Sequence, residues 1–177
     1  MPVDRSDCRW AHHGLQVLSM SLLPFFQWCD STWIGVTIRE SRYLFPIIET
    51  VHLLGLTLLL GTTIIVSLRL FGIGMRRQPV AQLAEDLAPW TLGSLIVMLS
   101  TGLLLFLSEA LKCYDSPPFR LKMVFLLAAI LYQFTVYRRF TRSSKAASMR
   151  VWSGVVAAVS LGLWFGVGLM GRAIGFY

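Results

Sequence analysis

The sequence predicts an all-α integral membrane protein, a bundle of four transmembrane helices with an N-terminal interfacial helix. Hydrophobic residues make up 55% of the 177 residues, charged residues only 14%, and the mean hydropathy is +0.65. Soluble domains of this length are far less apolar. Four apolar runs reach the roughly 20 residues that a helix needs to cross the hydrocarbon core. None of them alternates polar and apolar residues as the strands of a membrane barrel do.

The first forty residues differ from the rest of the chain. Residues 1–13 form a polar, charged tail. The apolar stretch that follows is too short to span a bilayer, and no A-x-A cleavage site of a signal peptide comes after it. Trp28 and Trp33 suit the headgroup level, where an amphipathic ring is half hydrated. We therefore expect residues 14–40 to form an interfacial amphipathic segment.

Residues 41–177 are expected to hold the four-helix bundle. The expected spans cover residues 46–68, 90–107, 119–137 and 151–171. Three of the spans have a proline near their start, where a helix needs no backbone N–H. These prolines are Pro46, Pro89 and Pro118. We expect each of them to lie in a first helical turn.

The orientation follows from the short loops, because lysine and arginine there resist transfer across the membrane. The loop between the third and fourth spans, RRFTRSSKAASMR, has five basic residues and no acid. The loop between the first and second spans adds Arg76 and Arg77. We therefore place both loops in the cytoplasm of a bacterial cell and both termini in the periplasm, as a multi-pass protein of the inner membrane.

Spans that alternate in direction bring four helix ends to one side: the starts of the first and third spans and the ends of the second and fourth. Each of these ends carries ionisable residues, namely Glu49 and His52, Glu109, Arg120 and Lys122, and Arg172. An ionisable residue at the centre of a membrane helix costs roughly 2.5–3.5 kcal/mol on insertion scales. Such residues therefore tend to face the bundle and pair. We predict that these six residues form one cofactor-binding site beneath a common membrane face.

Glu49 and His52 form the most specific part of this predicted site. Their i, i+3 spacing places them on one helical face, within reach of a shared ligand. The same spacing supplies metal ligands in di-iron bundles, although those bundles carry the motif on two helices and this chain has it once. His52 is the predicted metal ligand, and a packing role for its imidazole is the alternative.

Composition and motifs argue against several other classes of protein. A net charge of +7 would suit nucleic acid, but the basic residues lie in short clusters between apolar runs, as in loops that face anionic lipid. The three cysteines show no C-x-x-C spacing and no histidine at zinc-finger distance. No serine or cysteine lies in a recognisable nucleophile motif, which argues against a hydrolase.

Several motifs resemble one family of proteins. The segments FPIIETVHLLGLTLLLGT, RLFG, TGLLLFLSEAL and SPPFRLKMVFLL, within about residues 22–140, resemble a family of uncharacterised bacterial inner-membrane proteins with four helices, classed as a domain of unknown function. This resemblance implies an architecture and no activity. One histidine in a small four-helix membrane bundle is also distantly similar to membrane cytochromes b and to copper-resistance membrane proteins.

Three functions remain as alternatives for a protein whose first partner is the lipid bilayer. The first is a redox electron-transfer subunit that binds haem b or a quinone, with His52 as a ligand and Arg120 or Lys122 paired with a propionate or a quinone oxygen. Haem with two axial ligands would require a homodimer, or a Met or Lys as the sixth ligand. The second is a non-catalytic anchor or assembly partner for another membrane protein. The third is the handling of copper or a small solute, and the sequence leaves open whether the protein is an enzyme.

Overall fold

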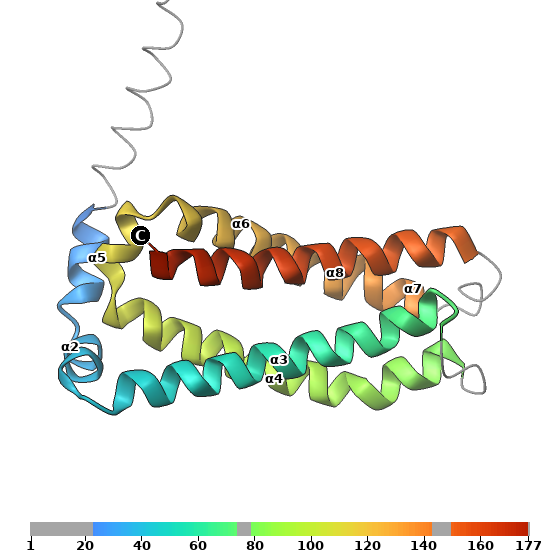
Figure 1. Cartoon of the computed structure of the whole chain (residues 1–177), viewed down its shortest axis with the longest axis horizontal. Coiled ribbons are helices and arrows are strands. Elements are labelled where there is room, and N and C mark those ends of the chain that lie inside the picture. The colour runs from blue at the N-terminus through green and yellow to red at the C-terminus, as the bar shows by residue number, and fades with distance from the viewer. Residues whose placement is uncertain (1–22, 74–78, 143–149, 177) are drawn as a thin grey trace, which may run out of the picture.

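The computed structural model describes residues 23–73, 79–142 and 150–176, and the regular secondary structure within these ranges is entirely helical. Four long helices lie along a common axis (Figure 1). They are α3 (Leu44–Leu70), α4 (Val80–Ser108), α6 (Pro117–Tyr132) and α8 (Arg150–Ala173). α6 continues through a π-helical turn, η1 (Gln133–Tyr137), into α7 (Arg138–Arg142). This architecture confirms the predicted four-helix bundle.

Each of the four spans is long and apolar enough to cross a membrane. Inside a bilayer the backbone must satisfy its own N–H and C=O groups, so the apolar runs form helices. Large apolar side chains are exposed on all four, among them Leu54, Ile96, Val124 and Leu169. Soluble proteins rarely expose contiguous apolar surface on this scale. These faces contact lipid, and the chain is a multi-pass membrane protein.

The spans pack in the spatial order α4, α3, α8, α6. α3 contacts both α4 and α8, α8 contacts α6, and α4 approaches the third span chiefly at α7. One core cluster includes Leu59, Leu95 and Trp164, and a second includes Val66 and Tyr137. The side of the bundle between α4 and α6 is therefore its least closely packed side.

α4 begins at Val80, well before the start that the sequence suggested. Pro79 occupies the N-cap in an extended conformation (φ −62°, ψ 141°), and Pro89 lies inside the helix. The expectation that Pro89 would lie in a first turn was wrong, because the proline ten residues upstream already fills that role. Inside the helix, Pro89 has no N–H to donate to the Glu85 carbonyl. The other two prolines do lie in first turns, as expected.

Three short helices lie at the end of the bundle where α3 starts and α4 ends (Figure 1). They are the helix over residues 23–30, α2 (Trp33–Glu40) and α5 (Ala110–Asp115). α2 packs against α4 and α3, and Trp28 and Trp33 expose their rings. The described part of the expected interfacial segment, residues 14–40, thus consists of two short helices joined at residues 31–32. Its first part and the polar tail, residues 1–13, lie outside the described residues.

Candidate functional site

The four polar helix ends lie at one end of the bundle (Figure 1). α3 and α6 begin there, at Leu44 and Pro117, and α4 and α8 end there, at Ser108 and Ala173. We call this end of the bundle the site end. All six predicted site residues belong to it, and the directions of their side chains decide which of them meet.

His52 points from α3 to α4. Its Nδ1 lies 3.0 Å from the hydroxyl oxygen of Thr101, and that hydroxyl donates to the Val97 carbonyl at 2.6 Å. With its proton at Val97, the hydroxyl oxygen accepts from the ring tautomer that carries the proton on Nδ1. The Met98 backbone is a further hydrogen-bond partner of the ring. In that tautomer Nε2 keeps its lone pair. Metal-bound histidines are oriented in the same way, by a partner on the other ring nitrogen.

Gly102 gives the imidazole its space. A Cβ at this position would lie 3.1 Å from Cε1 of His52, closer than side chains ordinarily approach. Neither Thr101 nor Gly102 was predicted from the sequence as part of the site. The signal available was their adjacency in TGLLLFL, because a helix that receives a polar ring from its neighbour needs a hydrogen-bonding group and a gap side by side.

Lys122 is a second ionisable group in the spans at the site end. It is half-buried in the second turn of α6 and acts electrostatically on both His52 and Cys113. Its ammonium lies over Gly171 of α8, where a Cβ would be 3.3 Å from Nζ. Among the described residues, no carboxylate forms an ion pair with this ammonium and no group hydrogen-bonds to it.

The other four predicted residues do not join this pair. Glu49 is exposed on α3, and Arg172 is exposed near the end of α8. Glu109 Oε2 lies 3.7 Å from Lys112 Nζ. Arg120 donates to a backbone carbonyl of α5 at 3.3 Å. Among the six predicted residues, the link found at the site end is therefore the electrostatic effect of Lys122 on His52, and a single site of all six stays a prediction.

Cys113 is buried in α5 beside this pair. Burial raises the pKa of its thiol to about 11; the Glu109 carboxylate acts in the same direction, and Lys122 and Lys112 oppose it. The thiol is therefore protonated and neutral at physiological pH. A neutral thiol cannot serve as a counter-ion for Lys122.

Within the described ranges, no three side chains of His, Cys, Asp or Glu are grouped closely enough to hold a metal. The positive charge of Lys122 also disfavours a second cation beside His52. The metal role of His52 thus stays a prediction without further ligands among these residues.

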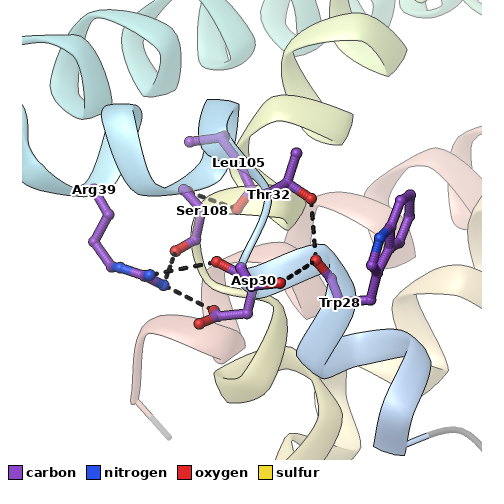
Figure 2. A network of polar contacts seen from close by, with 7 residues as sticks. Trp28, Asp30, Thr32, Arg39, Leu105 and Ser108 are labelled. Atoms are coloured by element: carbon purple, nitrogen blue, oxygen red, sulfur yellow. Dashed lines mark hydrogen bonds and ion pairs between the residues drawn. The ribbon is translucent and has the colours of Figure 1, made fainter.

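A polar clamp that the sequence did not reveal holds α2 to the site end (Figure 2). Arg39 donates to Asp30 Oδ1 at 2.8 Å and to the Ser108 carbonyl at 3.2 Å. One turn earlier, Gly35 packs directly on the carbonyl of Leu107. The last carbonyls of a helix have no intrahelical donors, so α2 closes the C-terminal end of α4.

A cavity of about 220 Å³ lies between the spans, farther from the site end, and is lined by α3, α4, η1, α7 and α8. We call it the lateral cavity. Its polar lining residues are Thr62, Thr63, Glu85, Thr91, Gln133, Tyr137, Arg138, Thr141 and Trp164. The helix α6 itself contributes no lining residue. The cavity therefore lies against the least closely packed side of the bundle.

Two buried polar atoms of residues that line the lateral cavity have no hydrogen-bond partner in the described part of the chain. They are Nε1 of Trp164, a residue only 1% exposed, and Oε1 of Gln133. A buried donor or acceptor without a partner costs about 1–3 kcal/mol, and a bilayer has no bulk water to relieve that cost. Such atoms mark a place where a bound molecule would complete the hydrogen bonding.

The backbone around the lateral cavity is irregular on two sides. Gln133 opens the π-helical turn η1, and such turns inside α-helices are frequent at functional sites. On α4, Pro89 leaves the Glu85 carbonyl without its helical donor. Between them, Thr91 donates to the hydroxyl of Thr62 at 3.1 Å. The sequence reasoning assigned no role to this region, although an amide in the third span and a proline in the second were the signals available.

Residues 25–177 match a family of unknown function, DUF6644. No curated protein and no solved structure matches the chain. The match extends the predicted resemblance to the end of the chain. The distant similarity to membrane cytochromes b and copper-resistance proteins has no match behind it.

Proposed function

The chain belongs to the DUF6644 family of unknown function, and we propose that it is a quinone-binding subunit of a redox assembly in the bacterial inner membrane. The quinone ring binds in the lateral cavity. A partner membrane protein exchanges electrons with the ring, and the termini of this chain face the periplasm.

The observation that supports this proposal is the pair of unpartnered buried polar atoms on Trp164 and Gln133, two residues that line the lateral cavity. Trp164 Nε1 is a donor and requires an oxygen acceptor. Gln133 is an amide that can turn either its oxygen or its NH₂ group to a ligand. Trp164 therefore donates to a ring oxygen in both redox states, while Gln133 donates to a quinone carbonyl or accepts from a quinol hydroxyl.

The size of the cavity suits a single ring. An engineered apolar cavity of about 150 Å³ binds benzene, and the lateral cavity offers about 220 Å³. Its apolar walls include Leu59, Leu92 and Leu95. A macrocycle such as haem b is much larger than one substituted six-membered ring, so the volume favours the quinone among the two redox ligands.

A lipid-soluble ligand reaches such a cavity from the bilayer. α4 approaches the third span chiefly at α7, and α6 does not line the cavity. Leu92 and Phe134 line the cavity and are also exposed to lipid. An isoprenoid tail would lie along these apolar side chains while the ring occupies the polar interior.

The chain's own residues bind and orient the ring and handle protons. Oxidation of a quinol releases two protons and two electrons, and the electrons pass to the redox partner. Glu85 lines the lateral cavity and is exposed on α4. Its carboxylate can therefore accept a proton from the ring and release it at the membrane surface.

Replacement of Trp164 tests the proposal. The variant Trp164→Phe keeps an aromatic ring and removes the N–H donor. We expect it to bind a water-soluble quinone analogue about 10-fold more weakly, because one hydrogen bond is lost. The measurement is a binding titration of the purified chain in uncharged detergent, together with quinone extraction from the same preparation.

Trp152→Phe is the matched control, because Trp152 is exposed on the lipid-facing surface of α8. It should bind the analogue as the unmodified chain does. Equal affinities of the Trp164→Phe and Trp152→Phe variants, or the absence of both extractable quinone and saturable binding, would contradict the proposal. The latter result would favour an anchor without a small-molecule ligand.

Haem b at His52 is a second candidate, favoured by the Thr101 hydroxyl that holds the ring at Nδ1, on the side away from Nε2. The described residues supply one histidine, so a sixth ligand would come from a partner or a second copy. A Soret absorption band that disappears in His52→Ala would support haem at this site.

A further inference from the structure

The threonine hydroxyls that line the lateral cavity use their protons inside their own spans. Among the described residues these threonines are Thr62, Thr63, Thr91 and Thr141. Each hydroxyl oxygen lies 2.8–3.0 Å from a backbone carbonyl oxygen three or four residues earlier in the same span, to which it donates. A hydroxyl has one proton and two lone pairs. These side chains can therefore still accept hydrogen bonds, but their protons are already engaged.

Few donors in the lining of the lateral cavity are left for a ligand. Trp164 Nε1 is a buried donor without an acceptor. The Tyr137 hydroxyl lies 3.5 Å from the Ser67 hydroxyl oxygen, so these two groups pair with each other. Arg138 also lines the cavity but is exposed. Within the described residues, the buried lining thus holds one donor that lacks an acceptor and several oxygens that can still accept.

This pattern distinguishes the two redox states of a quinone. A quinone carbonyl oxygen only accepts a hydrogen bond, whereas a quinol hydroxyl both accepts and donates. If Trp164 donates to one ring oxygen, that oxygen in the quinol still carries a proton that requires an acceptor. A buried O–H without an acceptor is costly. An acceptor near Trp164 therefore favours the quinol.

Thr63 is the acceptor that the fold places for this proton. Its side chain is only 2% exposed, and among the described residues no group donates to its oxygen. Thr63 lies one helical turn after Leu59, which packs with Trp164 in one core cluster. The next buried apolar residue of α3, Val66, belongs to the second core cluster. Thr63 therefore lies level with the gap between the two clusters.

Gln133 lies at the same level of the bundle. α3 and α6 both begin at the site end and run in the same direction (Figure 1). Gln133 comes one turn after Ala129, a member of the first core cluster, and one turn before Tyr137, a member of the second. Leu59, Val66, Trp164 and Tyr137 all line the lateral cavity. The cavity thus lies between the two clusters, with Thr63 and Gln133 in its lining.

We propose that the lateral cavity selects the quinol over the quinone, and that Thr63 determines this selection. The inference rests on the quinone site proposed above. Trp164 donates to one quinol oxygen, and the hydroxyl of that oxygen donates to Thr63 Oγ1. The other quinol hydroxyl donates to Gln133 Oε1. A quinone has no proton for Thr63 and makes one hydrogen bond fewer, so the ligand that the cavity takes from the bilayer is the reduced form.

The test is a binding titration of the purified chain in uncharged detergent under argon, with trimethylbenzoquinone and its hydroquinone. We expect the hydroquinone to bind about 5-fold more tightly, the effect of one additional hydrogen bond. Thr63→Val keeps the branched shape and removes the oxygen. It should weaken hydroquinone binding at least about 5-fold and leave quinone binding within twofold. The Leu59 carbonyl keeps the Thr62 hydroxyl as a donor in this variant.

Thr57→Val is the matched control. Thr57 lies on the same helix, and its hydroxyl donates to the carbonyl four residues earlier at 2.8 Å, as that of Thr63 does. Its side chain is exposed and does not line the cavity. The affinities for both ligands should stay as in the unmodified chain. Thr63→Ser retains the oxygen and should retain the preference for the hydroquinone.

The outcomes separate this inference from the quinone site itself. Equal or tighter binding of the quinone in the unmodified chain, or equal losses for both ligands in Thr63→Val, would overturn the selection and leave the quinone site in place. Binding of neither ligand would overturn the quinone site and the selection with it. If Thr63→Val does not fold, the ratio of the two affinities in the unmodified chain and in Thr63→Ser still decides.

Discussion

His52 and Lys122 occupy their positions because two glycines leave room for them. The imidazole faces Gly102 and the ammonium faces Gly171. In membrane helices small residues allow close approach of backbones, and here they also admit polar side chains between helices. The identity of a single neighbour thus decides whether a polar group in a span meets lipid or another helix.

The protonated state of the Cys113 thiol leads to a testable prediction about this single residue. The pKa of its thiol is raised from 9.0 to about 11 by burial in the folded chain. Because the thiolate is the reactive form, we expect alkylation near pH 8 to be about 100-fold slower than for a free thiol, from a two-unit difference in pKa. The measurement is the alkylation rate against pH in a variant with Cys8 and Cys29 replaced by serine.

The raised pKa of the Cys113 thiol also makes the stability of the fold depend on pH. A thiol whose folded pKa lies above its unfolded value stabilises the fold fully below pH 9.0, and this contribution is lost as the pH rises to about 11. Unfolding in denaturant should restore an ordinary alkylation profile. A folded-state profile with its midpoint near 9.0 would show that Cys113 is not buried as described.

At the scale of elements, the contact between α2 and α4 depends on Gly35. A Cβ at this position would collide with the Leu107 carbonyl, a backbone atom that cannot rotate away. We expect Gly35→Ala to move α2 from the end of α4, to break the Arg39 contact with Ser108, and to destabilise the protein by about 1–3 kcal/mol. Thermal unfolding in detergent measures the change.

Gly93→Ala in α4 is the control for this substitution. No atom lies within 4 Å of a Cβ at Gly93, and alanine is favoured over glycine in helices by about 0.5–1 kcal/mol. Its melting temperature should stay the same or rise. Equal losses in the two variants would mean that the effect comes from the substitution itself and not from the α2–α4 contact.

The number and approximate extent of the long helices were predictable, because length and apolarity alone determine a span. The start of α4 was not, since two prolines precede the apolar run and either one could begin a helix; Pro79 does so and Pro89 does not. The π-helical turn at Gln133 was also not predictable. It depends on how the third span packs against α8 and α4, which local sequence does not encode.

At the scale of the whole molecule, the meeting of four polar ends was predictable and the pairing of their side chains was not. Alternation of the spans fixes which helix ends lie on the same side of the membrane. The rotation of each helix about its axis decides which side chains touch, and α3 and α6 are apolar on nearly every face, so their sequences do not indicate an inward side. Glu49 is therefore exposed, while His52 contacts α4.

The orientation of the bundle is the last prediction. The end opposite the site end carries exposed Arg138 and Arg139 and adjoins two basic loops, and positively charged loops stay in the cytoplasm. We therefore expect the site end to face the periplasm.

Single-cysteine reporters in a chain without its native cysteines measure this orientation. Lys112→Cys lies at the site end, and Arg139→Cys lies at the opposite end; both positions are exposed. In intact cells with a permeable outer membrane, a membrane-impermeant maleimide should label the first and leave the second unlabelled until the inner membrane is opened. The reverse pattern would put Lys122 and His52 at the cytoplasmic face. It would also place the Glu85 end of the lateral cavity at the periplasm, so that protons from an oxidised quinol would leave on that side of the membrane.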